Sequence, residues 1–530
     1  MCFDKKGGYL HSNMTKRDAN MRHVIMSNAE PVQPTVMEAD LEDALQFAGV
    51  GKYQVLHSAL MLATLVAAVL EMIGVAFILP AAACDLNVPD SLKGILTSLP
   101  NLGIILTAPF WGRAADSFGR KPVLLFSLAA SGVMGLIASF MPNLVSFAVL
   151  KLACSLFLSC PSSLGYAYVC EMLPSHRRDI AVLIVNGLLN VFTVFNPALA
   201  WLILSYDWQY NWGVIVMRPW RLLTAVYSLP LLITAVIMFA TDESPKFLMT
   251  RCKESQALDV VKKIYRVNTG LPEDTFCVKF LRSPHETDSI HSGSGSELAP
   301  KSSRESAWSL LRPPHLKWFA LTGFLMFGVF SFLNGLFLFA PDTINKVMSN
   351  PSTSGTVCEL IVQTDNSTST KCTDSISHDT FSIMVVTTLV YGVLITATSM
   401  SPLSKKTLLV GMFIVVGAGC LVAGLSTNRI VAGIAMSSLQ ITSLGIGPLT
   451  AYVVHLFPTS LRGTAVGAVL MFGRIGSVVG ANVAGISLQA ACMATFYAFA
   501  LFVFLCAGLS FLLPPDHVSK PSKADPASDS

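Results

Sequence analysis

The chain has 530 residues, of which 52% are hydrophobic and 13% are charged, and its formal net charge is +4. Soluble domains carry about 25% charged residues, so a chain this long and this apolar argues against an ordinary soluble enzyme and for a lipid bilayer as its surroundings. The small net charge gives no reason to expect a nucleic-acid partner.

The first segment, residues 1–50, is polar and contains no cleavable signal sequence, so we expect a cytoplasmic N-terminal tail. Within it, Leu41, Ala44, Leu45 and Ala48 recur at helical spacing. This pattern predicts a short amphipathic helix that lies on the inner membrane surface.

Spanning helices need about 20 mostly apolar residues. Segments of this kind lie near 54–82, 92–111, 122–140, 144–171, 179–204, 219–240, 316–340, 380–400, 404–424, 428–456, 462–487 and 490–513. They predict an all-α membrane protein with twelve transmembrane helices in two six-helix halves, 51–241 and 316–513.

Two connections between these segments are long. Residues 242–315 are charged and then rich in Ser, Gly and Pro, which predicts a cytoplasmic linker with a helix at 256–266 and a flexible stretch at 283–303. Residues 341–379 are polar and predict an external loop, and residues 514–530 predict a cytoplasmic C-terminal tail.

Basic residues fall in alternate short loops: Arg113, Arg120, Lys121, Arg177, Arg178, Lys405, Lys406 and Arg462. The positive-inside rule then puts both termini in the cytoplasm and the loop 341–379 outside the cell or in a vesicle lumen. In that compartment Asn366, which begins an Asn-Ser-Thr sequon, is a glycosylation candidate, and Cys358 and Cys372 are candidates for a disulfide.

Residues 112–121 read Gly-Arg-Ala-Ala-Asp-Ser-Phe-Gly-Arg-Lys between two membrane-length segments. Gly112 and Gly119 allow a tight turn and a close approach of helices. The pattern resembles the loop between the second and third spans of the major facilitator superfamily. That resemblance implies a solute carrier.

Further motifs narrow the resemblance. Residues 168–178 and 452–463 each combine a helix end, a proline and an arginine, and residues 243–246 read Glu-Ser-Pro-Lys, similar to a signature of the sugar and organic-ion branch. The long loop after the seventh span, together with residues 51–54 and 219–221, resembles the synaptic vesicle glycoprotein 2 family. The resemblance implies alternating access by rocking of the two halves around a central cavity.

Two ionisable residues lie in the middle of predicted spans. We interpret Glu71 as a residue that attracts a cationic solute or exchanges a proton, with a structural pair as the alternative, because a carboxylate at bilayer depth usually faces a polar interior. Arg474 keeps its charge and needs an acidic partner, with Glu71 as one candidate, helix carbonyls or an anionic solute. These interpretations of Arg474 stay open.

The other candidates for the cavity are polar or aromatic. Asn186 and Asn190 are four residues apart and share a helix face, where they either bind a solute or join helices. The remaining candidates, for which ordinary packing is the alternative, are Tyr166, Phe332, Asn334 and Tyr452. Lys151 at the start of the fourth span is expected to reach the headgroups.

Charged residues at the inner helix ends predict a cytoplasmic gate. We expect Asp116 to pair with Arg120, and Glu171 to pair with Arg177 and Arg178, so that they latch the helices when the carrier is open to the outside. The predicted gate also contains Gly112, Gly119, Lys121 and Arg462.

These features predict a carrier of a small polar or organic solute such as an organic ion, a sugar or a neurotransmitter, with proton coupling as one possibility. We expect a monomer in the plasma membrane or a vesicle membrane, with no catalytic residue, cofactor or metal. Ala68 stands where the family often has a second acid, and Lys151 where it usually has arginine. These departures motivate the alternative, a vesicle-membrane binding or regulatory protein that keeps the carrier fold with little transport.

Overall fold

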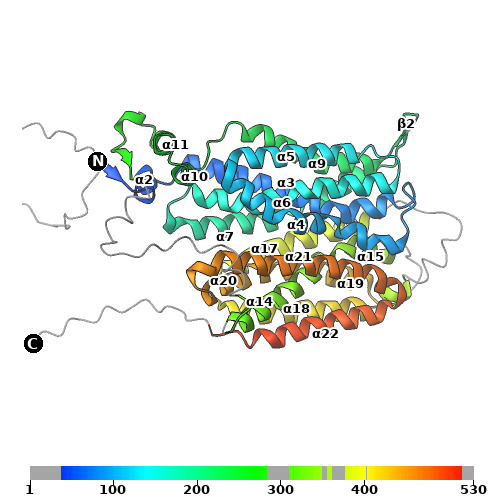
Figure 1. Ribbon diagram of the computed structural model, residues 1–530. Coiled ribbons are helices and arrows are strands. Elements are labelled where there is room, and N and C mark those ends of the chain that lie inside the picture. Colours follow the sequence, from blue (N-terminus) through cyan, green and yellow to red (C-terminus); the bar gives the residue numbers. More distant parts are fainter. Residues whose placement is uncertain are drawn as a thin grey trace, which may run out of the picture.

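The computed structural model describes residues 37–213, 215–282, 310–313, 315–348, 355–360, 376–401 and 403–515. Within these ranges, 12 helical segments are long and apolar enough to cross a membrane. They confirm the predicted all-α membrane fold and run alongside one another in a single bundle (Figure 1).

The first six spans form one half of the bundle. They are α3 (Lys52–Ala82), α4 (Asp90–Phe118), α5 (Arg120–Ala138), α6 (Leu144–Glu171), α7 (Ser175–Phe192) continued by α8 (Phe195–Leu204), and α9 (Pro219–Met238). Asn143 starts α6, because its side chain accepts a hydrogen bond from the backbone N–H of Ser146 and so satisfies one donor of the first turn.

The last six spans form the other half. They are α14 (His315–Leu333) continued by η2 (Leu336–Phe339) and α15 (Ala340–Met348), then α17 (His378–Ser399), α18 (Lys405–Leu425), α19 (Arg429–Ser437) with η3 (Ser438–Gly445) and α20 (Ile446–Leu456), α21 (Thr459–Ala490) and α22 (Cys492–Ser510). The seventh span is longer than predicted, since α15 continues into the predicted loop 341–379.

A small group of elements covers one end of the bundle. It consists of β1 (Met37–Ala39), α2 (Leu41–Ala48), α10 (Pro245–Thr250), α11 (Glu254–Thr269), η1 (Glu273–Thr275) and β4 (Val278–Leu281), with β1 parallel to β4. We call this group the linker cap and its end of the bundle the linker end (Figure 1). At the opposite, distal end, β2 (Tyr210–Asn211) pairs antiparallel with β3 (Val216–Met217).

The linker cap corrects one prediction. The amphipathic helix predicted from residues 41–48 exists as α2, but Ala44, Leu45 and Ala48 are fully buried and share a core with Leu258 of α11. The apolar face of α2 therefore lies on protein and not on the membrane surface. The helix predicted at 256–266 is α11, and the flexible stretch predicted at 283–303 lies outside the described residues.

The outer surface of the spans is apolar. Side chains more than half exposed within spans include Leu106, Phe126, Val149, Val236 and Leu501. Contact of so much apolar surface with water would be unfavourable in free energy, whereas lipid chains can cover this surface without such a penalty. The chain is therefore an integral multi-pass membrane protein.

Candidate functional site

Polar side chains from the two halves meet where two spans are interrupted. α7 gives way to α8 around Thr193, and the 3-10 turn η3 interrupts the tenth span. Ser443 Oγ donates a 3.1 Å hydrogen bond to Asn190 Oδ1, and Gln440 Nε2 donates a 3.2 Å bond to Thr193 Oγ1. Interrupted helices at membrane depth occur where the backbone is buried in protein or lines a water-filled cavity, and in carriers they often form the solute site.

Two more predicted residues join this cluster from the first half. Tyr166 donates its hydroxyl proton to Asn186 Oδ1 at 3.2 Å, and Asn190 Nδ2 donates to the Asn186 carbonyl at 2.8 Å. The structure therefore brings Tyr166, Asn186 and Asn190 together, and only Asn190 makes a side-chain bond to the second half. We call the six residues the polar interface: Tyr166, Asn186, Asn190, Thr193, Gln440 and Ser443.

The polar interface retains hydrogen-bonding capacity. Gln440 is 5% exposed, and its Oε1 has no hydrogen-bond partner among the described residues. An unsatisfied buried carbonyl is costly, so such an atom marks a place for water or a solute hydroxyl.

Arg474 of α21 contacts both halves. Its Nη1 donates to Asn101 Oδ1 of α4 at 3.0 Å and lies 3.6 Å from Met72 Sδ of α3, while its guanidinium carbon lies 5.2 Å from the ring centroid of Phe330 of α14. Among the described residues Arg474 forms no ion pair, and Glu71 is not its partner. The charge is held by neutral groups alone.

Glu71 lies inside the first half. Lys151 Nζ is 2.5 Å from Glu71 Oε1, and Ser228 Oγ donates to Glu71 Oε2 at 3.0 Å. The two ionised side chains are only 2% and 4% exposed. The expectation that Lys151 reaches the headgroups is therefore wrong. For Glu71 these contacts favour the alternative of a structural pair, because each of the two buried charges neutralises the other.

Two predicted cavity residues pack within the second half. Phe332 is fully buried, with its ring centroid 5.2 Å from that of Phe499. Asn334 Nδ2 donates to Ser477 Oγ at 3.2 Å and joins α14 to α21. Neither contact reaches the first half, so helix packing accounts for both residues.

Tyr452 also lies within the second half. Its hydroxyl donates to the Pro514 carbonyl at 3.3 Å, and its side chain is 4% exposed. Because Pro514 directly follows the last span at the linker end, Tyr452 lies away from the polar interface. Its assignment to the cavity is not supported by these contacts.

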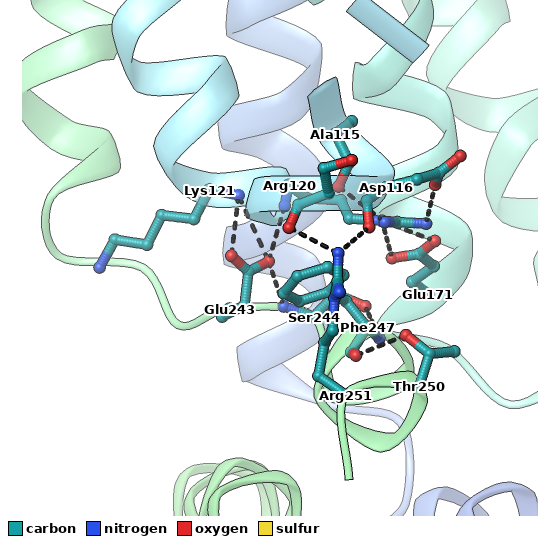
Figure 2. Close-up of polar contacts among 11 residues, drawn as sticks. Ala115, Asp116, Arg120, Lys121, Glu171, Glu243, Ser244, Phe247, Thr250 and Arg251 are labelled. Carbon is teal, nitrogen blue, oxygen red and sulfur yellow. Dashed lines mark hydrogen bonds and ion pairs between the residues drawn. The ribbon is translucent and has the colours of Figure 1, made fainter. Parts of the chain in front are cut away.

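At the linker end, Arg120 is the centre of a charged network (Figure 2). Its Nε donates to both carboxylate oxygens of Glu171, at 3.1 and 3.0 Å, and its Nη2 lies 3.1 Å from Asp116 Oδ1. The Asp116–Arg120 pair was predicted. Glu171, however, pairs with Arg120 and not with Arg177 or Arg178.

Glu243 caps the start of α5 (Figure 2). Its carboxylate accepts hydrogen bonds from the backbone N–H of Arg120 at 3.0 Å and of Lys121 at 3.3 Å, where the positive end of the helix dipole favours an anion. Gly119 permits this contact. Its φ is +108°, and a Cβ there would lie 2.3 Å from Glu243 Oε2.

The other predicted gate residues behave differently. Arg178 binds Glu42 of α2 and donates to the carbonyls of Cys170 and Leu173 at 2.8 and 3.0 Å. Among the described residues, the side chain of Arg177 has no hydrogen bond or ion pair. The predicted close approach at Gly112 is absent, since a Cβ there would meet nothing within 4 Å.

The second half repeats one part of this arrangement. Lys121 Nζ donates to the carbonyls of Phe239 and Thr241 after α9, and Lys406 Nζ donates to those of Phe511 and Leu513 after α22 at 2.7 and 2.9 Å. Arg462 Nε, by contrast, is buried without a partner in the described part of the chain. The contacts of the network join α4, α5 and α6 to the segment of α10 and lie within the first half, so its role as a gate stays a prediction.

The distal end is closed by contacts between the halves. Lys93 Nζ of α4 lies 3.2 Å from Asp342 Oδ2 of α15. A Cβ on Gly485 of α21 would lie 2.9 Å from the Cα of Gly94 of α4, so the two backbones touch. Trp201 Nε1 donates to His378 Nδ1 at 3.2 Å and adds a third contact.

The linker-end turns of α4 and α21 carry glycines with open space beside them. On the linker-end turns of these helices, a Cβ on Gly112, Gly463 or Gly467 would meet nothing within 4 Å. The same two helices are in backbone contact distally and face open space at the other end. This is the geometry of a bundle that is closed at its distal end.

Comparison with known proteins agrees with the fold. The model of the Major Facilitator Superfamily matches residues 60–361, which is more than half of the chain. The chain belongs to the major facilitator superfamily.

Solved structures with this superfamily's fold resemble the chain. The xylose transporter XylE from E. coli in a partially occluded inward open conformation is similar with a TM-score of 0.60 and 15% identity, over 87% of this chain and 99% of that chain. The inward open conformation of the same transporter also gives a TM-score of 0.60, with 97% of that chain covered. At this identity the likeness shows the fold alone.

Curated superfamily members give a narrower similarity. Synaptic vesicle glycoprotein 2C of Mus musculus is 29% identical over 251 residues, which are 46% of this chain and 34% of the relative. Synaptic vesicle glycoprotein 2A of Homo sapiens is 29% identical over 255 residues, 47% of this chain and 34% of the relative. The chain thus covers about a third of the length of these relatives.

The disulfide differs from the prediction. Cys358 is bonded to Cys492, the first residue of α22, and not to Cys372. The sequence suggested the nearer cysteine in the same loop, whereas the fold brings Cys358 to a residue 134 positions away. Cys372 and the sequon at Asn366 lie outside the described residues.

Several contact residues of this superfamily member were missed by sequence reasoning. They are Glu42, Lys93, Asn101, Asp342 and Gln440. The sequence could have indicated Asp342, Lys93 and Gln440 as candidates, because each is a polar residue in or next to an apolar segment. Nothing in the sequence marks which partner each of them meets.

Proposed function

We propose that this member of the major facilitator superfamily moves a small polar or organic solute across a membrane by alternating access. The observation that carries the proposal is the polar interface between the halves, in a bundle whose halves also meet at the distal end. Rocking of one half against the other would expose the polar interface to the two sides in turn.

The orientation follows from the charge distribution. The linker cap and residues 1–50, 242–315 and 514–530 would then lie in the cytoplasm, and the loop within 341–379 would lie on the opposite side. The similarity to proteins named synaptic vesicle glycoproteins favours a vesicle membrane over the plasma membrane. No covalent step is part of this function, and one chain suffices for it.

Proton coupling would involve Glu71 and Lys151. The pair lies among α3, α6 and α9, so protonation of Glu71 would weaken a contact that fixes the packing of these three spans. A carboxylate that changes its proton content can therefore bias the conformation without touching the solute. The similar xylose transporter is also described as a proton symporter, which is in line with this idea.

Uptake into liposomes tests the proposal. Purified protein would be reconstituted with and without a pH gradient, and uptake from a pool of sugars, amines and organic acids would be measured by mass spectrometry. Asn190→Ala should reduce uptake of whichever solute is carried, whereas Asn211→Ala, in the exposed strand β2, should leave it unchanged. Absence of any uptake by folded protein would refute the carrier function.

The second candidate is a vesicle-membrane binding or regulatory protein with little transport. Ala68 in place of an acid favours it. Lys151 in place of arginine no longer does, because lysine forms the ion pair with Glu71. The double variant Glu71→Gln with Lys151→Met, which removes both charges of the pair, separates the candidates. A carrier would lose uptake or its pH dependence while trafficking stays normal, whereas a regulatory protein would keep its function unless partner binding is lost.

A further inference from the structure

Arg474 differs from two buried basic side chains of other spans, Lys151 and Arg221. Lys151 pairs with Glu71, and Arg221 pairs with Asp85 at 3.2 Å. In the described part of the chain Arg474 has no carboxylate partner. A guanidinium at bilayer depth that is left without a counter-charge is unfavourable, so a missing anion is the simplest completion of this arrangement.

The free edge of the guanidinium is accessible. Nη1 is used by Asn101, whereas Nε and Nη2 have no hydrogen-bond partner among the described residues. Enclosed atoms without a partner include Nε of Arg462 but neither of these two nitrogens. The Nε and Nη2 donors are therefore unused and not fully enclosed, and together they match the two oxygens of a carboxylate.

The surroundings of Arg474 favour an organic anion over a small inorganic one. The Phe330 ring lies 5.2 Å from the guanidinium carbon, and the Met72 sulfur lies 3.6 Å from Nη1. These groups offer apolar contact beside the charge. A solute with a carboxylate and an aromatic or aliphatic body would use both features.

Asn101 fixes the position of the charge. It is 1% exposed and lies on α4, while Arg474 lies on α21, the two helices that are in contact at the distal end. The neutral amide orients the guanidinium without cancelling its charge. An aspartate at this position would keep the contact and supply the counter-charge from within the protein.

We infer that Arg474 is the anion-binding residue of this carrier, that its solute is an organic carboxylate, and that Asn101 is the positioning residue that presents the guanidinium to it. The inference rests on the proposed function where it calls the protein a carrier. Binding of the anion itself can be measured without transport.

The test compares three ligands of one shape with different charge. Full-length protein in nanodiscs of zwitterionic lipid is titrated with benzoate, benzamide and benzylamine, and binding is followed by the thermal unfolding midpoint and by competition with labelled benzoate. We expect benzoate to bind and to raise the midpoint, and the neutral and cationic analogues to bind at least 10-fold more weakly. Equal binding of all three, or no binding of benzoate, overturns the inference.

Variants assign the effect to the residue. Arg474→Gln should weaken benzoate binding at least 10-fold. Arg474→Lys keeps the charge but loses the two-pronged guanidinium, so its affinity for benzoate should lie between those of the parent protein and Arg474→Gln. Asn101→Asp should also abolish binding, and it should fold even where Arg474→Gln does not. Asn482→Asp is the matched control, because Asn482 makes the equivalent bond from α21 to Ser98 of α4 at 3.3 Å. Unchanged benzoate binding in Asn101→Asp, or equal loss in Asn482→Asp, overturns the inference.

Two further outcomes separate this inference from the proposed function. Charge-selective benzoate binding that depends on Arg474, without uptake of any solute, supports the anion site and contradicts the carrier. Uptake of neutral solutes that is unaffected by Arg474→Gln supports the carrier and contradicts the anion site. Displacement of benzoate by added anionic lipid would assign the site to a lipid headgroup, and it would contradict the assignment to a solute.

Discussion

Lys93 and Asp342 form an ion pair between the two halves, with Nζ 3.2 Å from Oδ2, and the pair closes the distal end of the bundle beside the backbone contact of Gly94 and Gly485. Both side chains are partly buried, at 11% and 23% exposure. The pair can form only while α4 and α15 lie together. It therefore favours the distally closed state over a state that is open at that end.

The first prediction concerns this pair. Asp342→Asn removes one charge, and partly exposed pairs contribute about 0.2–1 kcal/mol, so the distally open state should gain up to about 5-fold in population. Ser98→Cys reports the change, because Ser98 is 3% exposed and becomes reachable only when the distal end opens. Labelling by an impermeant maleimide should be faster in Asp342→Asn than in the parent.

The matched control is Asp379→Asn. Asp379 is an exposed carboxylate in the first turn of α17 at the same end. It should leave the labelling rate of Ser98→Cys unchanged. Equal rates in both variants would mean that the Lys93–Asp342 pair does not bias the conformation.

A second prediction concerns the buried pair. Glu71→Gln leaves the Lys151 ammonium without its counter-charge, and breaking a buried pair typically costs about 3–5 kcal/mol. Glu71→Gln with Lys151→Met removes both charges and should restore much of the stability. Thermal unfolding in detergent measures the difference. A double variant as unstable as the single one would show that hydrogen bonding to Ser228, and not charge, dominates at this position.

The course of the spans could be predicted from the sequence because it depends on local composition. The segment predicted near 428–456 is the span Arg429–Leu456, and that near 54–82 is the span Lys52–Ala82. Twenty apolar residues in a row have few alternatives to crossing the bilayer. The same holds for α11, whose amphipathic pattern and length are both local.

The partners of the charged residues could not be predicted in this way. Glu71 meets Lys151 eighty positions later, and Glu171 meets Arg120 and not the arginines next to it in sequence. The pattern of α2 showed an apolar face but not what covers it, because lipid and α11 satisfy that face equally well. Such contacts depend on how the helices pack, which one sequence does not show.

A third prediction compares two glycines of the segment 112–121, Gly112 within α4 and Gly119 between α4 and α5. Gly119→Ala places a side chain at φ +108° and within 2.3 Å of Glu243 Oε2, so it should destabilise the protein by about 1–3 kcal/mol and displace the carboxylate that caps α5. Gly112→Ala adds a methyl group in open space within α4 and should be neutral or slightly stabilising. Thermal unfolding of the two variants and the parent protein measures this difference in stability. Equal losses would mean that the loop conformation around Gly119 differs from the one described.

The last prediction concerns the disulfide between Cys358 and Cys492. The bond closes a loop of 134 residues and ties the segment before α17 to the start of α22, and native disulfides of this kind typically contribute about 2–4 kcal/mol. Cys358→Ser and Cys492→Ser should each lower the thermal midpoint by the same amount, and the double variant should lower it no further, because all three remove one bond. Cys506→Ser, which changes a free cysteine of the same helix, is the control for helix packing. Additive losses from Cys358→Ser and Cys492→Ser would show that the two cysteines act independently, and peptide mapping without reduction would then identify the true partners.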